Sequence, residues 1–172
     1  MRWCSLAVLG ICVLAPGPAA AQEPVTPAGL EGAWKLQSLS YDGQPQEAVG
    51  YLVFHGQYYS WVTTRKRPNL TAEISRKPAQ ELTDADKLLI IEAYNSMTAA
   101  AGTYTIDKGA IAFMREAVRS PHLKGSAEVR ASWFEKGKLI QDFEGGGRRQ
   151  VYVWERVSGP GAAPKRTAAD KP

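Results

Sequence analysis

Short runs of alternating apolar and polar residues, separated by turn residues, occupy most of the chain between residues 29 and 157. A period of two is typical of strands with one buried face. Pairs such as Asp42-Gly43 and Lys108-Gly109 stand between runs and suit tight hairpin turns. The pattern predicts eight strands joined largely as hairpins: 33–40, 49–55, 57–64, 103–107, 110–118, 126–135, 139–144 and 148–157.

One segment, 83–100, has the composition of a helix instead. Thr83 can cap its N-terminus, and the negative charge of Asp84 in the first turn interacts favourably with the helix dipole. Leu88 and Ile91 fall at helical spacing and predict one apolar face. We expect this helix between the third and fourth strands, where it would cover one mouth of the fold or pack on its wall.

This order of elements indicates an all-β barrel or sandwich with a single inserted helix. A parallel α/β fold is disfavoured because parallel strands need a crossover connection between each pair, and here one helix accompanies eight strands.

The N-terminal segment 1–21 predicts a secretory signal. Arg2 precedes a short apolar run at 6–14, and Ala19-Ala20-Ala21 supplies the small residues that a signal peptidase reads, with cleavage before Gln22. The alternative, an uncleaved membrane anchor, would need about 20 apolar residues. Lipidation is disfavoured because Ile11, not a small residue, precedes Cys12. The expected location is therefore periplasmic or secreted.

The rest of the chain divides into three parts: a flexible leader at 22–28, a barrel domain at 29–157, and a Gly-, Pro- and Ala-rich disordered tail at 158–172. Both cysteines, Cys4 and Cys12, leave with the signal, so no disulfide is expected. Without Arg2 the chain keeps 20 basic residues against 17 acids, a net charge of +3. So mild a charge on an exported protein does not predict a nucleic-acid partner, and no transmembrane segment is expected.

Residues at both ends of the predicted barrel domain resemble a known motif. The first strand opens with Gly32-Ala33-Trp34, and the last closes with Val153-Trp154-Glu155-Arg156. Glycine, any residue, tryptophan on the first strand is similar to the motif of lipocalins and other calycins. In that group an arginine near the end of the last strand packs across the tryptophan. Physically, the indole buries apolar area at a barrel end, and a guanidinium can lie flat on it by cation–π contact.

The order of further motifs resembles the bacterial and fungal lipocalin-like domain family, whose members form calycin-type β-barrels. These motifs are Leu30 to Leu36, Gly50 to Val53, Gly102 to Asp107 and Val153 to Arg156. The resemblance implies an eight-stranded antiparallel barrel in which Gly32, Trp34 and Arg156 are structural. Such domains often carry a histidine or other polar residue on the fifth strand, where this chain has Met114-Arg115-Glu116 and so departs from the family pattern.

Sequence patterns for several kinds of chemistry are missing. The two histidines, His55 and His122, lie in predicted turns and outside any nucleophile motif, which favours solvated surface positions. The chain has no H-x-H or H-E-x-x-H pair. Gly145-Gly146-Gly147 lacks the residues of a phosphate loop and precedes a strand. We therefore expect no catalytic residue, no metal and no cofactor.

A set of residues at alternating strand positions predicts an aromatic cup inside the barrel. If the pairs Tyr59/Trp61, Phe113/Arg115 and Ala131/Trp133 each face inward, Arg115 is a single polar handle among rings. An eight-stranded barrel either fills with side chains or holds one small ligand. Both alternatives stay open here. The predicted ligand-binding residues are Tyr59, Trp61, Tyr104, Phe113, Arg115 and Trp133.

We expect the protein to bind a small hydrophobic or amphipathic molecule in this cup. One alternative is an enzyme that catalyses isomerisation or cyclisation by positioning, with an inward Glu116 or Glu128 as acid or base. The other is a filled-barrel envelope accessory or interaction module. A basic cluster within 65–77 is either a solvated loop or a site that attracts anions. The sequence does not determine the oligomeric state.

Overall fold

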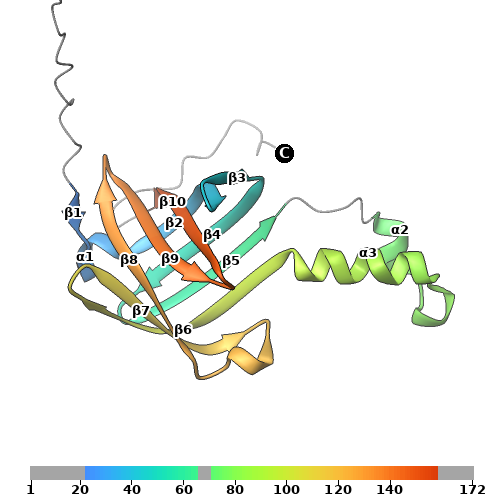
Figure 1. The fold of residues 1–172 in the computed structure, drawn as a ribbon. Coiled ribbons are helices and arrows are strands. Elements are labelled where there is room, and N and C mark those ends of the chain that lie inside the picture. The colour runs from blue at the N-terminus through green and yellow to red at the C-terminus, as the bar shows by residue number, and fades with distance from the viewer. Residues whose placement is uncertain (1–21, 66–70, 159–172) are drawn as a thin grey trace, which may run out of the picture.

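The computed structural model describes residues 22–65 and 71–158, and its main feature is a closed antiparallel barrel (Figure 1). The strands pair in the cyclic order β2-β4-β5-β6-β7-β8-β9-β10, and β10 returns to β2. These eight strands are β2 (Gly32–Tyr41), β4 (Ala48–His55), β5 (Tyr58–Arg65), β6 (Met97–Asp107), β7 (Ala110–Val118), β8 (Ala127–Glu135), β9 (Lys138–Gly145) and β10 (Arg148–Ser158). The prediction of an eight-stranded antiparallel barrel is confirmed.

The hairpin turns form as their residues predict. Lys108 and Lys136 take positive φ angles of 46° and 51°, and each is followed by a glycine with φ near 77° (78° for Gly109, 76° for Gly137). Two successive residues with positive φ match the right-handed twist of the flanking strands. At Gly102 the need for glycine is steric: a Cβ atom there would lie 2.0 Å from the Met114 carbonyl oxygen.

Two short strands join the barrel in addition to the predicted eight. β1 (Glu23–Pro24) pairs with β8, and β3 (Gln44–Gln46) pairs with β2. The helix α1 (Pro27–Leu30) follows β1, and its last residue, Leu30, is fully buried. Residues 22–28, expected to be a flexible leader, therefore include a strand paired with the barrel and the start of a helix.

The predicted helix is present but shorter than expected. α3 (Asp84–Asn95) begins with a reciprocal cap between Thr83 and Asp86. It follows β5, the fifth strand of the chain, and not the third, because β1 and β3 precede it. The short helix α2 (Ala72–Arg76) and the 3₁₀ turn η1 (Ala79–Glu81) lie between β5 and α3. Residues 97–100, expected in the helix, extend β6 instead because they pair with residues 61–64 of β5.

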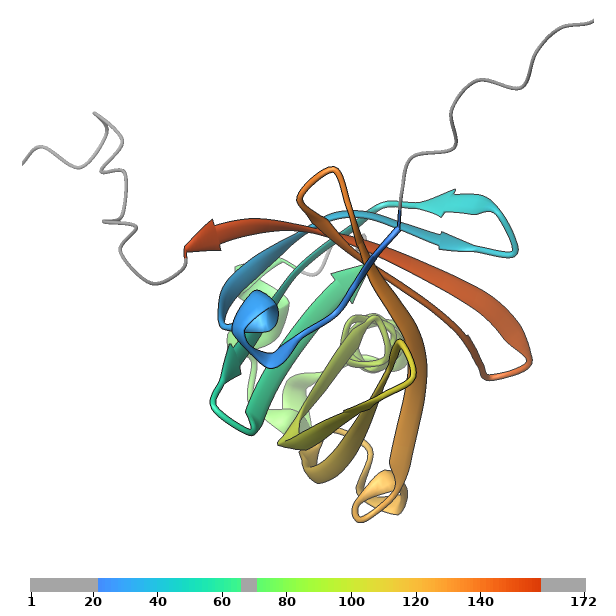
Figure 2. The ribbon, with the colours of Figure 1, turned by 90° about the vertical axis from the view of Figure 1, so that its left-hand side faces the viewer.

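The helix α3 neither covers a barrel mouth nor packs on the wall. It leaves one end of the barrel and projects away from it (Figure 1), so that it is seen nearly end-on in Figure 2. Tyr94 and Arg119 hold its base: the Tyr94 hydroxyl donates to the Arg119 carbonyl, and Arg119 Nη1 donates to the Tyr94 carbonyl. The remaining 3₁₀ turn, η2 (Pro121–Leu123), lies in the connection from β7 to β8.

The end of the barrel that carries both described termini is closed by side chains. The guanidinium of Arg156 lies over the Trp34 ring, 4.2 Å from its centroid, which is the contact expected from the first and last strands. Arg156 donates to the backbone carbonyls of Gly29 and Glu31, and the Trp34 indole donates to Leu30. Gly32 has φ 114°, a conformation that L side chains rarely adopt. This end is called the closed end below.

Apolar side chains fill the barrel from the closed end to its middle. Fully or nearly fully buried members of this core are Leu30, Trp34, Leu52, Phe54, Ile111, Phe113, Leu139 and Trp154. The predicted signal segment 1–21, the tail beyond Ser158, and Lys66 and Arg67 of the predicted basic cluster lie outside the described residues.

Candidate ligand-binding site

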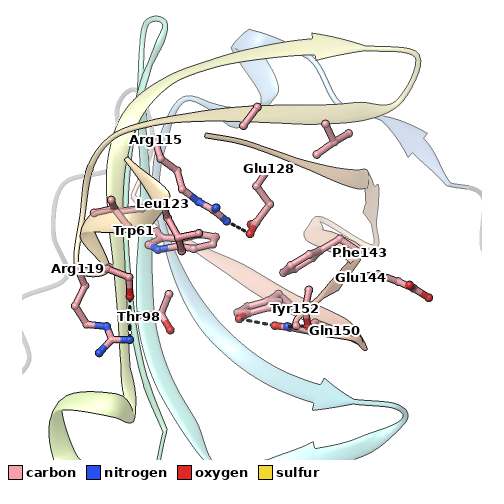
Figure 3. Close-up of a pocket in the computed structure, with 18 of the residues that line it drawn as sticks. Trp61, Thr98, Arg115, Arg119, Leu123, Glu128, Phe143, Glu144, Gln150 and Tyr152 are labelled. Atoms are coloured by element: carbon pink, nitrogen blue, oxygen red, sulfur yellow. Dashed lines mark hydrogen bonds and ion pairs between the residues drawn. The ribbon is translucent and has the colours of Figure 1, made fainter. Parts of the chain in front are cut away.

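A cavity of about 500 Å³ opens at the end of the barrel opposite the closed end. Its wall comes from β2, β5, β6, β7, β8, β9 and β10 and from the connection between β7 and β8, and Figure 3 shows most of the lining residues. The volume lies within the range of small-molecule sites. The lining residues used below are Trp61, Arg115, Arg119, Glu128, Phe143 and Tyr152. This end is called the open end.

Three charged side chains meet beneath this cavity. Arg115 on β7 donates to Glu128 on β8 (Figure 3), and Arg130, two residues further along β8, donates through Nε to the same carboxylate at 2.6 Å. All three are inward positions, since alternate residues of a strand share a face. The Arg130 side chain is fully buried, and those of Arg115 and Glu128 are 11% and 17% exposed.

Aromatic rings surround the Arg130 guanidinium. Its central carbon lies 3.6 Å from the Trp61 ring centroid and 4.3 Å from that of Phe143, with Phe113 and Tyr152 both at 5.1 Å. Gln141 accepts from Arg130 Nη1 at 3.0 Å and from the Trp154 indole at 3.0 Å. The rings and the amide therefore hold Arg130 in one position.

The cluster carries an excess positive charge, because two guanidinium groups share one carboxylate. Burial lowers the pKa of Arg130, and the nearby Glu128 partly opposes this. Burial also raises the pKa of Tyr59 and of Tyr152 to about 12, so both hydroxyls stay protonated at neutral pH. A buried net charge is costly unless a counter-charge accompanies it, so this end of the barrel favours anions.

Two buried donors near the cluster have no hydrogen-bond acceptor within the described chain. They are Nε1 of Trp61, on the cavity wall, and Nε2 of Gln141, beside Arg130. Buried donors normally find a partner.

Only two of the six predicted ligand-binding residues, Trp61 and Arg115, line the cavity. Tyr59, Tyr104 and Phe113 are buried in the filled part of the barrel, where they belong to the core. The Tyr104 hydroxyl donates to the Gly56 carbonyl at the closed end, at 2.9 Å. All five face inward as expected, but Tyr59, Tyr104 and Phe113 lie too far toward the closed end to reach the cavity.

The sixth residue, Trp133, does not face the cavity, and the expected inward orientation is wrong. On β8 the even-numbered residues Arg130 and Ser132 are buried, whereas Val129 is 60% exposed and Trp133 is only partly buried. Residues of β8 alternate between the inside and the outside of the barrel as expected, but the even-numbered residues face inward and the odd-numbered residues face outward. The hydrophobic-inside rule assigned the apolar set to the interior, but here the interior holds the polar set.

Register could have shown the correct phase. The two-residue turn at Lys136-Gly137 places Phe134 directly opposite Leu139. In 138–144, Leu139 and Phe143 share one face, and the three charged residues Lys138, Asp142 and Glu144 share the other with Ile140, so Leu139 faces inward. Directly opposite residues share a face. Phe134, and with it Arg130 and Glu128, must then face inward as well.

The carboxylates proposed for the enzyme alternative do not lie in the required surroundings. Glu116 is exposed and accepts from the Thr103 hydroxyl on the outside of the barrel. Glu128 faces inward but lies between two arginines. Among residues 22–65 and 71–158, no group of three or more His, Cys, Asp or Glu side chains could hold a metal. His55 and His122 are exposed, and His55 pairs with Glu31 at 2.9 Å.

Comparison with known proteins finds no matching family model and no match among curated proteins. The resemblance to lipocalin-like domains therefore stays a prediction. Within the described part of the chain, no helix has both the length and the apolar character needed to cross a membrane.

Proposed function

We propose that the protein binds a small amphipathic molecule in the cavity at the open end of the barrel. The observation that supports this most strongly is the meeting, in a space of about 500 Å³, of an aromatic wall and a positively charged cluster. The ligand's apolar part would lie against Trp61, Phe143 and Tyr152. Removing apolar surface from water would drive its binding, at about 25 cal/mol per Å².

The two arginines have different roles in this proposal. Arg130 is enclosed by rings and by Gln141, so it supplies a fixed charge behind the wall. Arg115 lines the cavity and can exchange its contact with Glu128 for one with a ligand anion. We therefore assign Arg115 as the residue that orients the ligand's negative group. An exported protein with this site would act as a carrier or scavenger in the periplasm or outside the cell.

A matched pair of fluorescent probes tests the proposal. The anionic dye 1-anilinonaphthalene-8-sulfonate and the neutral N-phenyl-1-naphthylamine share one apolar body and differ in the sulfonate. We expect both to bind, the anionic dye more tightly. Arg115→Ala should weaken the anionic dye about tenfold, the scale of one charge-assisted hydrogen bond, and leave the neutral dye within about twofold.

Arg149→Ala is the control, because Arg149 is an exposed arginine that pairs with Asp142 outside the cavity. It should change neither affinity. If neither dye binds wild-type protein, or if Trp61→Ala leaves both affinities unchanged, the cavity is not a ligand site. Equal loss of both dyes in Arg115→Ala would show that Arg115 supports the fold and does not recognise charge.

A further inference from the structure

The apolar face that the sequence predicts for α3 has no partner among residues 22–65 and 71–158. Leu88 is 61% and Ile91 is 53% exposed. The buried residues of this helix, Asp86 and Ala93, lie on the opposite side of the helix axis. A helix of 12 residues is marginal in water without packing. The Leu88–Ile91 face is therefore apolar surface on an element that needs tertiary contacts.

A second unpartnered apolar surface lies on the outside of the barrel. Val49, Tyr51 and Val53 alternate along β4, and Tyr51 is paired with Val62 of β5. All four are between 39% and 66% exposed. Next to them, Val62 borders a shallow groove of about 310 Å³ between β5, β6 and β7. Its floor is made of small side chains, chiefly Ala99, Ala101 and Ala117.

We propose that these two surfaces are the two halves of one homodimer contact. The Leu88–Ile91 face of α3 in one copy packs into the alanine-floored groove of a second copy, and the second copy's α3 does the same in return. Because each chain carries both surfaces, a two-fold axis can place the α3 face of each copy in the groove of the other. The same contact then forms twice, and the assembly stops at a dimer.

The available area agrees with a stable dimer. From the exposed fractions of the large apolar residues on both surfaces, a chain offers roughly 600 Å², so that two reciprocal contacts bury roughly 1,200 Å², the lower end of the range for stable interfaces.

The charges around the two surfaces are largely balanced within each chain. On the helix, Asp84 pairs with Lys87 at 2.9 Å, and Glu92 lies beside Ile91. On the sheet, Lys35 of β2 lies directly opposite Glu155 of β10, and Arg119 lines the groove. The proposed contact therefore depends on apolar area and not on charge.

Sedimentation equilibrium of the purified protein tests the proposal. We expect a dimer with a dissociation constant of about 1 µM or lower. Ile91→Asp on the helix and Val62→Asp in the groove should each raise that constant about 30-fold or more. Both sites are on the surface, so circular dichroism should show a folded barrel for each variant. Val129→Asp, at an equally exposed site on β8 outside the patch, is the control and should leave the dimer unchanged.

A mixture of the two variants gives the sharpest result. The Ile91→Asp copy keeps an intact groove, and the Val62→Asp copy keeps an intact helix. The mixture should therefore associate where each variant alone does not. A monomeric wild type, a Val62→Asp effect without an Ile91→Asp effect, the reverse, or no association in the mixture would each overturn the proposal.

Discussion

Each end of the barrel places an arginine on a tryptophan, but the two arginines differ in how much hydration they lose on folding. At the closed end, Arg156 lies over Trp34 from an exposed position and donates to two backbone carbonyls. Toward the open end, fully buried Arg130 lies over Trp61 and shares the carboxylate of Glu128 with Arg115.

The Arg156–Trp34 contact completes the closed end of the fold, whereas the Arg130–Trp61 contact places a positive charge inside the barrel. Arg156 gives up little hydration, and it satisfies carbonyls at the closed end. Arg130 gives up all of its hydration in a place where an apolar residue would serve packing at least as well. Under the function proposed above, this buried charge would serve ligand binding and not stability.

The largest expected effect comes from removing the shared carboxylate. Glu128→Ala leaves two buried arginines facing each other without a counter-charge, which should cost about 3–5 kcal/mol in the free energy of unfolding. Urea denaturation measures this loss. A saturating anionic ligand that binds at Arg115 should restore part of it.

Glu116→Ala is the matched control, since Glu116 lies on the outer face of the neighbouring strand β7. Its cost should stay within about 0.5 kcal/mol. Similar losses for the two glutamates would mean that the inner cluster holds no special charge balance, and the contrast between the ends would fail.

Arg156→Ala should have a smaller effect, about 1–2 kcal/mol, from the lost cation–π contact and two backbone hydrogen bonds. Arg156→Lys should recover less than half, because an ammonium group cannot lie flat on the indole and reach both carbonyls. Thermal unfolding followed by circular dichroism measures both variants. Full recovery by lysine would show that charge alone, without the planar group, closes this end.

The smallest effect is confined to alkaline pH. Burial raises the pKa of Tyr59 and Tyr152 to about 12, above the ordinary value of 10.0. Because the folded-state pKa is the higher one, their contribution to stability is complete below pH 10 and is lost as pH rises toward 12. Phenolate absorbance should show these two of the seven tyrosines ionising last. Ionisation of all seven near pH 10 in the folded protein would contradict this.

The barrel was predictable because its evidence is local. Alternation and turn pairs such as Lys108-Gly109 specify strands and hairpins without knowledge of the interior, and Gly32, Trp34 and Arg156 mark the strands that meet at the closed end. The site was less predictable because depth along a barrel depends on register. Tyr104 and Arg115 both face inward, yet one lies at the closed end and the other in the cavity.

Two errors have a common physical origin. The expected inward Trp133 and the expected packing of Leu88 and Ile91 on the barrel both assume that one chain buries its own apolar residues. On β8 the interior instead takes Glu128 and Arg130, and α3 keeps its apolar face in solvent. Apolar patterning predicts that a face will be removed from water. It does not specify whether the chain itself, a ligand or another protein will cover that face.

Arg119 belongs to two regions at once. It lines the cavity, and its guanidinium lies 4.7 Å from the Tyr94 ring centroid at the base of α3. This one side chain therefore joins the rim of the cavity to the base of the projecting helix. If a ligand bound as proposed displaced Arg119, the helix would lose this contact, and linkage would make the effect of each on the other equal.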